Sequence, residues 1–251
     1  MLQSYNFFCN FATVDWKIIH IDETDSTNRW LWSDSSSDDD ANRVVVAEYQ
    51  TAGKGCGTNS WESERGKNLT FSMQIHPKGI PANGQFHITE VTSVALCETL
   101  EHYIYNKVEI KWPNDIYVGD RKICGMLIEN RLQGGTIKDS IIGIGLNVNQ
   151  TAFVSDAPNP VSLRQLTGRE IDRHELLHAF LLALEAVWNR ESVSSDYRQR
   201  LYRRTERHSF EDNTGCFEAE IACVQEDGHL VLRDEGGQLR TYAFKEVQFV
   251  I

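Results

Sequence analysis

Short apolar runs with strand character recur along the 251-residue chain. They are rich in valine, isoleucine and other residues that favour strands, and several end at a turn residue. The expected strands are 44–49, 69–75, 109–113, 116–123, 123–129 and 140–149. Within 116–123, the Gly119-Asp120 pair is typical of a tight turn between antiparallel strands. These patterns predict that β-sheet is a major part of the fold.

Other segments have helical patterns. Residues 86–106 place apolar side chains near helical spacing, and residues 174–188 are rich in alanine and leucine. Residues 25–27 offer side-chain oxygens that can cap the start of a further helix. A last predicted helix, 197–208, is a basic island with five arginines in an acidic protein. Its arginines fit either a solvated helix face or a docking patch for an acidic protein partner.

The end of the chain has a different pattern. Beyond residue 205, four or five short strand patterns follow one another, separated by turns at 226–228 and 235–237. This pattern fits a small β-barrel of the SH3-like type. We therefore expect two domains, at residues 1–204 and 205–251.

Charge and hydropathy argue against two classes of partner. The chain carries 25 Lys and Arg against 36 Asp and Glu, a formal net charge of −11. A protein that binds nucleic acid is usually basic, so no nucleic acid is expected as a partner. No apolar run approaches the roughly 18 residues that span a bilayer, and the N-terminus lacks a signal-peptide pattern. We expect a cytoplasmic protein that does not enter a membrane.

The cysteines and one polar segment have simple interpretations. Six scattered cysteines form no C-x-x-C pair, so reduced thiols are expected rather than disulfides or a zinc site. Residues 33–42 are too polar to bury and are expected to form a solvated loop.

A glycine-rich segment follows the expected strand 44–49. Residues 53–57 read Gly-Lys-Gly-Cys-Gly, so backbone N–H groups there can approach an anion closely, and Lys54 adds a positive charge. The segment does not match a Walker A loop, and a tight turn is the alternative explanation. Trp61, just beyond, fits either a ring that stacks on a ligand or a core residue.

A second segment places charged residues on a hairpin. Residues 111–115 read KWPND, and Lys122 follows on the next strand. Pairing of the two strands would bring Asp115 and Lys122 close together. Two cations and a carboxylate suit a reaction on a phosphoanhydride, because the cations balance phosphate charge. An ordinary ion pair on a surface hairpin is the alternative.

Five motifs together resemble those of the biotin protein ligase family, in the short form without an N-terminal DNA-binding domain. The motifs are DSTN at 25–28, AEYQTAGKG with NSW within 47–61, KWPND at 111–115, RKICGMLIE at 121–129 and IGIGLNVN at 142–149. The resemblance covers about residues 16–190, and the terminal barrel matches the family's small C-terminal domain. It implies an α+β fold: a mixed β-sheet catalytic domain packed with helices, biotin/lipoate ligase-like and related to class II synthetases, plus the SH3-like β-barrel.

The resemblance also implies a function. Members of the family use MgATP to activate biotin as biotinyl-5′-AMP and then pass biotin to one lysine of a carrier protein. The expected activity is therefore that of a biotin–[acetyl-CoA-carboxylase] ligase, with biotin and ATP as substrates and Mg²⁺ as the ion. A biotin carboxyl carrier protein domain is the expected protein partner. A homodimer is compatible with the family, and the resemblance identifies no metal ligands.

Residues that match the family's motifs take expected roles. Lys122 is expected to contact the biotin carboxylate and the α-phosphate, and Asp115 to orient the incoming lysine or act as its base. The expected biotin-binding residues are Ser26, Thr27, Asn28, Gln50, Lys54, Gly55, Cys56, Lys122, Gly125 and Gly143. The expected nucleotide-binding residues are Gly53, Lys54, Trp61, Lys111, Asn114, Gly145 and Asn147.

The glycine-rich segment departs from the family's usual G-R-G-x-x-G. Lys54 and Cys56 stand where arginines are usual, and lysine lacks the two-pronged contact of arginine. We therefore expect weaker retention of the adenylate, unless another group compensates. Cys56, flanked by glycines near cations, is also the first candidate for a reactive thiol.

Other functions remain open at this point. A helix-turn-helix domain needs more residues than precede Asp25, so a DNA-binding repressor is not expected. A lipoate–protein ligase shares the architecture, but the long glycine run of that group is missing. A non-catalytic relative that binds biotin or a protein partner is the alternative from another class.

Overall fold

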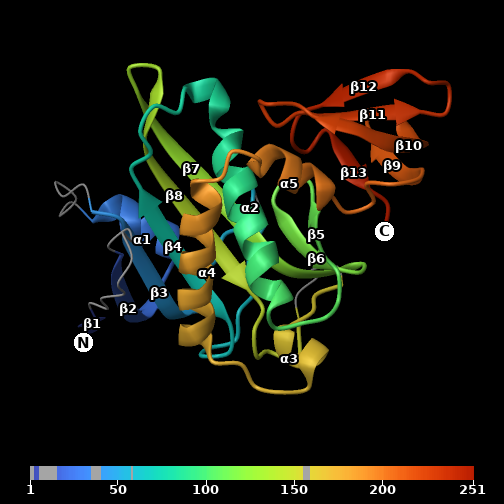
Figure 1. The fold of residues 1–251 in the computed structure, drawn as a ribbon. Coiled ribbons are helices and arrows are strands. Elements are labelled where there is room, and N and C mark those ends of the chain that lie inside the picture. The colour runs from blue at the N-terminus through green and yellow to red at the C-terminus, as the bar shows by residue number, and fades with distance from the viewer. Residues whose placement is uncertain (1–2, 6–15, 35–40, 58, 155–158) are drawn as a thin grey trace.

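The computed structural model describes residues 3–5, 16–34, 41–57, 59–154 and 159–251. In this part of the chain, the larger body is built on a mixed eight-stranded sheet with the order β1-β2-β3-β4-β8-β7-β6-β5 (Figure 1). β2 and β3 are parallel, and the other neighbouring pairs are antiparallel. The expected α+β fold, a mixed sheet packed with helices, is confirmed.

The elements of this body are as follows. The strands are β1 (Gln3–Tyr5), β2 (Lys17–Thr24), β3 (Arg43–Gln50), β4 (Leu69–Ile75), β5 (Val108–Lys111), β6 (Asp115–Val118), β7 (Arg121–Gln133) and β8 (Thr136–Leu146). The α-helices are α1 (Thr27–Ser33), α2 (Phe86–Glu101), α3 (Leu163–Thr167), α4 (Arg173–Trp188) and α5 (Val193–Gln199), and a short 3-10 helix spans Ala82–Gly84.

Alternating side chains give the sheet two different faces. Val44 and Val46 of β3 belong to the large apolar core, to which α2 and α4 also contribute. These two helices lie side by side across the sheet in Figure 1. Val45, between them in sequence, packs instead with Leu31 of α1 and Ile141 of β8 in a separate, smaller cluster. α1 therefore covers the opposite face of the sheet from α2 and α4.

Most expected elements are confirmed, with shifts at their ends. The helix expected at 86–106 stops at Glu101, and the strand expected at 109–113 is Val108–Lys111. α1 begins where a helix start was expected, but the Ser26 side chain makes no cap hydrogen bond. Instead, the Ser26 N–H donates to Asp25 Oδ1 at 2.7 Å.

The helix expected at 197–208 is wrong beyond Gln199, where α5 ends. The next residues pair with the edge strand β5. The Ile110 N–H donates to Arg200 O at 2.8 Å, and the Tyr202 N–H donates to Ile110 O at 2.9 Å. Leu201 and Tyr202 are both buried. Pairing with an otherwise open sheet edge outweighs the local helical pattern.

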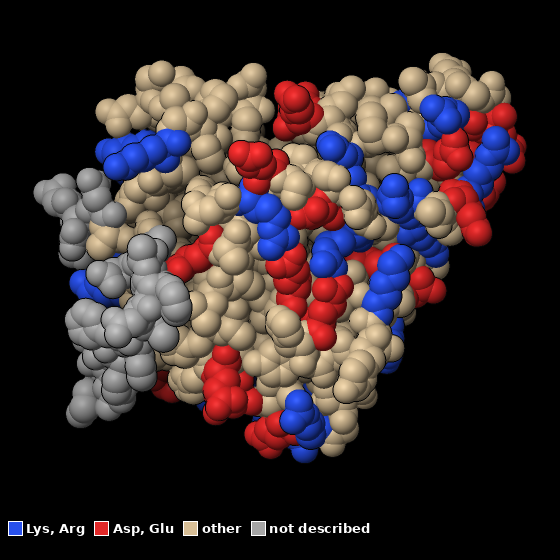
Figure 2. All heavy atoms as spheres, in the orientation of Figure 1, with Lys and Arg blue, Asp and Glu red and all other residues tan. Residues whose placement is uncertain are grey.

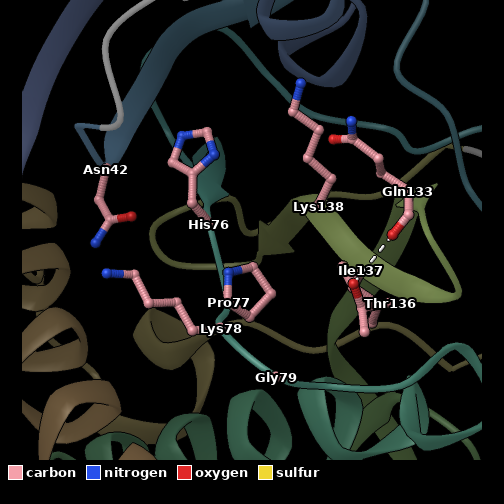
Figure 3. A pocket seen from close by; sticks show the side chains of 9 residues that line it. All are labelled: Asn42, His76, Pro77, Lys78, Gly79, Gln133, Thr136, Ile137 and Lys138. Carbon is pink, nitrogen blue, oxygen red and sulfur yellow. Dashed lines mark hydrogen bonds between the residues drawn. The ribbon is translucent and has the colours of Figure 1, made fainter.

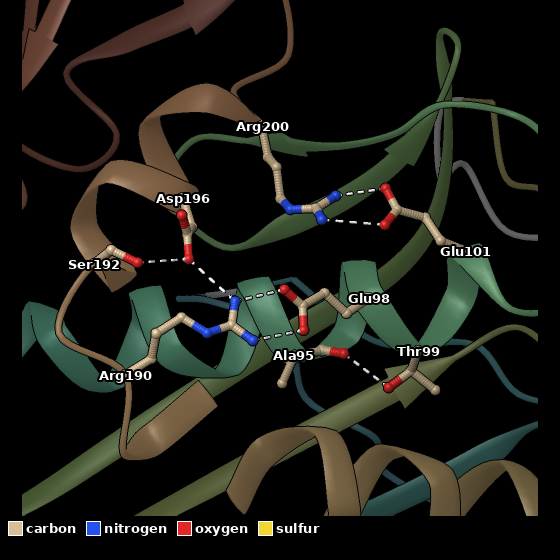
Figure 4. A network of polar contacts seen from close by, with 8 residues as sticks. All are labelled: Ala95, Glu98, Thr99, Glu101, Arg190, Ser192, Asp196 and Arg200. Atoms are coloured by element: carbon tan, nitrogen blue, oxygen red, sulfur yellow. Dashed lines mark hydrogen bonds and ion pairs between the residues drawn. The ribbon is translucent and has the colours of Figure 1, made fainter. Parts of the chain in front are cut away.

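An ion-pair network holds α5 against α2 (Figure 4). Arg190 Nη1 lies 2.7 Å from Glu98 Oε1 and 3.1 Å from Asp196 Oδ2, and the Arg200 guanidinium pairs with the Glu101 carboxylate. Figure 2 shows acidic and basic side chains interspersed over this face. Arg200 of the basic island therefore makes a contact within the fold, whereas a docking role for the island remains a prediction.

The end of the chain forms a second, five-stranded antiparallel sheet with the order β12-β11-β10-β9-β13. Its strands are β9 (His208–Asp212), β10 (Gly215–Val224), β11 (Leu230–Asp234), β12 (Leu239–Tyr242) and β13 (Val247–Phe249). Gly228 and Gly237 have φ angles of 91° and 82° in the two turns expected there. The expected small C-terminal β domain is confirmed. The proposed boundary after residue 204 falls in the connection between α5 and β9.

Two further observations concern membrane-spanning helices and the state of the cysteines. No helix in the described ranges has the length and apolar character needed to cross a membrane. The cysteines in those ranges are free thiols: Cys56, Cys97, Cys124, Cys216 and Cys223. Cys9 and residues 35–40 of the polar loop lie outside the described residues.

Candidate functional site

The sheet face covered by α1 carries glycines and small polar residues at its centre. On β8, Ile142, Ile144 and Leu146 join the large core, so Gly143 and Gly145 face the other side. β4 and β7 alternate in the same way. The residues that this face presents include Thr70, Ser72, Gly125, Gly143 and Gly145, and we refer to it as the site face.

A β-bulge turns Lys122 onto the site face. Ile116 of β6 pairs with Cys124 of β7, but the next residue, Tyr117, pairs with Lys122. The shift leaves one extra residue in β7 and re-aims the side chains beyond it. Lys122 lies opposite Tyr117, which shares a face of β6 with Asp115, and the extra residue puts Gly125 on that same face. Lys122 Nζ lies 2.7 Å from Asp115 Oδ2. The predicted proximity of this pair is confirmed, while its catalytic roles remain predictions.

Polar side chains from three elements meet beside the glycines. The Thr27 N–H donates to Gln50 Oε1 at 2.8 Å, and the Thr27 hydroxyl lies 3.1 Å from the same atom. Ser72 Oγ lies 2.6 Å from Thr27 Oγ1 and 2.6 Å from Asn28 Oδ1. A hydroxyl has one proton, so Ser72 donates to Thr27 Oγ1 or to Asn28 Oδ1 at any one time, while the Thr27 hydroxyl donates to Gln50 Oε1. The start of α1, the end of β3 and the middle of β4 thus form one hydrogen-bonded unit.

Asn28 has a fixed orientation in this unit. Its Nδ2 donates to Glu129 Oε2 at 2.8 Å and to Leu127 O at 3.3 Å, which leaves Oδ1 as the acceptor towards Ser72. A Cβ on Gly143 would collide with Asn28 Oδ1. Gly143 therefore makes room for Asn28, so its effect on a bound ligand would be exerted through that side chain.

The glycine-rich segment forms a hairpin, which we call the Gly-rich hairpin (residues 53–57 and 59–61). The Trp61 N–H donates to Gly53 O at 2.9 Å, and the Gly55 N–H donates to Asn59 O at 2.8 Å. A β-bridge between Lys54 and Ser60 continues this pairing. The hairpin begins directly after β3 and returns to place Trp61 over the site face.

The Trp61 indole lies against glycines of the site face. A Cβ on Gly145 would come within 2.8 Å of Trp61 Cδ2, and one on Gly125 would lie 3.0 Å from Cζ3. Lys122 Nζ is 5.7 Å from the indole centroid. Trp61 Nε1 and Asn147 Oδ1 are both buried with no hydrogen-bond partner among the described residues. Because buried polar groups are normally paired, these two atoms are candidates for contact with a ligand.

Two expected nucleotide-binding residues have contacts within the fold. Asn114 Nδ2 donates to Met126 O at 2.9 Å. Lys111 Nζ lies 5.3 Å from the ring centroid of Tyr117 and 5.4 Å from that of Phe249, which belongs to the C-terminal domain. Burial lowers the pKa of Lys111, although the negative charge of Asp115 acts in the opposite direction. Lys111 therefore packs between the domains, and its expected nucleotide contact remains a prediction.

Sequence reasoning did not identify Ser72 or Glu129 as site residues. A signal for Ser72 was present, because Thr70, Ser72 and Gln74 alternate with apolar residues along β4. That alternation shows that one face of a fully buried strand is polar. Glu129 could not be found this way, since its contact with Asn28 joins residues 101 positions apart.

A separate hollow of about 690 Å³ lies away from these residues (Figure 3). It is lined by Asn42, His76, Pro77, Lys78, Gly79, Gln133, Thr136, Ile137 and Lys138. None of the predicted site residues belongs to that lining. The described residues contain no group of three or more His, Cys, Asp or Glu arranged to hold a metal ion.

Comparisons with known proteins agree with the fold. The model of the biotin/lipoate A/B protein ligase family matches residues 21–147, just over half of the chain. The bifunctional ligase/repressor BirA of Bacillus subtilis is 32% identical over 173 residues, which are 67% of this chain and 52% of that protein. The chain thus spans about half the length of such curated relatives. The biotin–[acetyl-CoA-carboxylase] ligase of Mycobacterium tuberculosis is 28% identical over 71% of this chain and 68% of its own.

Solved structures with the same fold include a biotin protein ligase from Aquifex aeolicus in complex with biotin and ATP. It superposes with a TM-score of 0.76 at 24% identity, covering 96% of this chain and 100% of its own. At this level of identity the likeness concerns the fold.

Proposed function

Because the chain belongs to the biotin/lipoate A/B protein ligase family, we propose that it is an ATP-dependent biotin protein ligase. The observation that carries the proposal is the site face itself. A cation–carboxylate pair, a polar unit at the start of α1 and an indole all surround the same glycines. Relatives that bear the ligase name, and a similar structure in complex with biotin and ATP, support the assignment.

The proposed reaction has two steps. In the first, a carboxylate oxygen of biotin attacks the α-phosphorus of ATP, giving the mixed anhydride biotinyl-5′-AMP and releasing pyrophosphate. In the second, a lysine amine attacks the carbonyl carbon of the anhydride, AMP leaves, and the amine loses a proton to form an amide. Activation is necessary because a free carboxylate does not acylate an amine at neutral pH.

Lys122 and Asp115 are the proposed catalytic pair. The ammonium of Lys122 is fixed by its 2.7 Å contact with Asp115 and would stabilise negative charge as the acyl–phosphate bond forms. Asp115 would then orient the incoming lysine or accept its proton. Mg²⁺ commonly binds through one or two carboxylates together with substrate phosphates, and we assign it no protein ligand.

The polar unit favours biotin over lipoate. Thr27, Asn28, Gln50 and Ser72 offer both donors and acceptors, which suits the ureido group of biotin. The dithiolane ring of lipoate has no comparable groups. A site built from polar groups discriminates strongly against a ligand that leaves them unpaired. We therefore propose biotin as the acyl substrate, with lipoate as the alternative within the same family.

Trp61 has a proposed role in excluding water. The Gly-rich hairpin holds its indole over Gly125 and Gly145, near Lys122. An aromatic ring at this place can pack on a flat ligand and shield a hydrolysable anhydride. The indole Nε1 and Asn147 Oδ1, both without partners among the described residues, would then gain hydrogen bonds.

We propose a biotin carboxyl carrier protein domain as the acceptor and the cytoplasm as the location. The test is mass spectrometry of such a domain after incubation with the protein, biotin and MgATP. The expected result is a mass increase of one biotinyl group, absent without ATP, with lipoate in place of biotin, or when the acceptor lysine is arginine. Biotin binding by calorimetry without any transfer would instead support the non-catalytic alternative.

A further inference from the structure

The C-terminal domain reaches the Gly-rich hairpin through one side chain. Lys245 lies in the turn between β12 and β13, and its Nζ donates to Cys56 O at 3.3 Å, across 189 positions in sequence. A Cβ on Gly57 would collide with Lys245 Nζ, and Gly57 itself has a φ of 69°. The glycine thus makes room for the lysine at the tip of the hairpin.

The turn that carries Lys245 is held against the main body. Phe244 packs edge-to-face on Trp112, with ring centroids 6.2 Å apart, and Trp112 Nε1 donates to Gly228 O at 2.9 Å. Within the turn, the Ala243 N–H donates to a Glu246 carboxylate oxygen at 2.7 Å. Trp112 lies in the connection between β5 and β6, whose flanking residues Lys111 and Asp115 pair in register, so Phe244 packs on the connection that leads into Asp115.

The backbone of Lys245 is in an unfavourable conformation. Its φ of 73° lies in the left-handed region, which glycine adopts without steric strain and a lysine does not. A side chain at such a position persists when other interactions offset the strain, and function is a frequent reason. The Cys56 contact is an interaction that a glycine in this turn could not make.

The hairpin has little charge of its own. Lys54 is the one cation in the sequence between Gly53 and Trp61, and it is exposed. We propose that Lys245 is a positioning residue for the ligase reaction: it fixes the tip of the Gly-rich hairpin, so that Trp61 stays over the site face and the adenylate is retained. This proposal rests on the proposed function. It also identifies a group that compensates for the missing arginines of the hairpin.

The experiment compares wild type with Lys245→Gly, Lys245→Arg and a matched control, Glu206→Gly. Glu206 also has a left-handed backbone, with φ 70°, but lies in the connection before β9. Each protein is loaded with labelled biotin and MgATP, pyrophosphate is removed, and release of labelled adenylate is timed after an excess of unlabelled biotin. We expect Lys245→Gly to release adenylate about three- to fivefold faster, from the loss of one charge-assisted hydrogen bond at an exposed site.

A positioning role and a purely structural role of Lys245 predict different results, and the following results are expected for a positioning role. Glycine relieves the strain at φ 73°, so Lys245→Gly should melt no lower than wild type while it releases the adenylate faster. Lys245→Arg should retain the adenylate nearly as wild type does, and Glu206→Gly should be unchanged in release. Equal release rates for Lys245→Gly and wild type would overturn the proposal, as would faster release in Glu206→Gly.

A second readout does not depend on ligase activity. Trypsin cleaves after lysine, so cleavage after Lys54 in the ligand-free protein reports how firmly the hairpin is held. We expect faster cleavage at Lys54 in Lys245→Gly than in wild type or Glu206→Gly. If wild type forms no adenylate, the proposed function fails, and unchanged cleavage at Lys54 would then refute the positioning role separately.

Discussion

The serine-to-alanine substitution is expected to change stability in opposite ways at two buried serines on neighbouring strands. Ser72 and Ser140 both have a relative exposure of 0%. Ser72 Oγ lies 2.6 Å from both Thr27 Oγ1 and Asn28 Oδ1, whereas Ser140 Oγ has no hydrogen-bond partner among the described residues. Ser72→Ala should therefore be costly, and Ser140→Ala should be neutral or stabilising.

The size of the stability change depends on which polar groups each substitution leaves without a hydrogen-bond partner. Ser72→Ala leaves the Asn28 Oδ1 acceptor, which is fixed by the two bonds that Asn28 Nδ2 donates, without a donor. A buried polar group left unpaired costs about 1–3 kcal/mol. We take about 2 kcal/mol, which lowers Tm by about 4–8 °C in a protein of this size. Ser140→Ala removes a hydroxyl that is already unpaired, so no such cost arises.

Scanning calorimetry measures the Tm of the two variants, and titration calorimetry measures their affinity for biotin. We expect Ser72→Ala to bind biotin about fivefold more weakly as well, because Thr27 and Asn28 lose a shared partner worth about 1 kcal/mol. Ser140→Ala should bind as wild type does. If both alanine variants melt at the same temperature, the hydrogen-bonded unit that we describe does not hold the site together.

Three further outcomes are expected. Gly145→Ala places a methyl group within 2.8 Å of the Trp61 indole and should raise the KM for ATP about tenfold, by analogy with overpacking costs of about 1–3 kcal/mol; a KM equal to that of wild type would show that the indole is free to move. Gly57→Ala should speed adenylate release much less in a Lys245→Ala background than in wild type, since the methyl group no longer meets the ammonium, and strictly additive effects in this double-mutant cycle would contradict the contact. Burial, followed by neighbouring positive charge, lowers the pKa of His20 below the ordinary value of 6.5. Near and below pH 6.5 the folded chain therefore binds fewer protons than the unfolded chain. The stability that neutral His20 contributes is present above pH 6.5 and is lost as the pH falls below it. Tm measured from pH 7.5 to pH 5 should fall less in His20→Gln than in wild type, and parallel curves would refute the assignment.

The strands could be predicted because their patterns are local. In residues 142–149, apolar residues alternate with glycine and asparagine, so the same eight positions encode a core face and a site face. The hairpin turn at Gly119 was also predictable, since its φ of 58° is one that glycine adopts readily. The ion pair of Lys122 with Asp115 followed from that turn, which places Lys122 opposite Tyr117, on the face that Asp115 shares.

Features that depend on distant partners could not be predicted. The bulge that places Lys122 and Gly125 on one face arises from the pairing of two strands, and no single residue of β7 predicts it. Residues 200–202 have a helical pattern, but the open edge of β5 supplies hydrogen bonds that the pattern does not reveal. The contact of Lys245 with the Gly-rich hairpin likewise exists because a second domain folds against Trp112.

Biotin-dependent exchange of pyrophosphate into ATP tests the central claim, that Lys122 on the site face promotes adenylate formation. The assay compares wild type, Lys122→Ala and the control Lys107→Ala, an exposed lysine that pairs with Glu109. We expect exchange that requires biotin, does not occur with lipoate, falls about 100-fold or more in Lys122→Ala and is unchanged in Lys107→Ala. Exchange that persists in Lys122→Ala would contradict the catalytic role of Lys122, and exchange that is absent from a wild-type protein that still binds biotin would contradict the ligase activity.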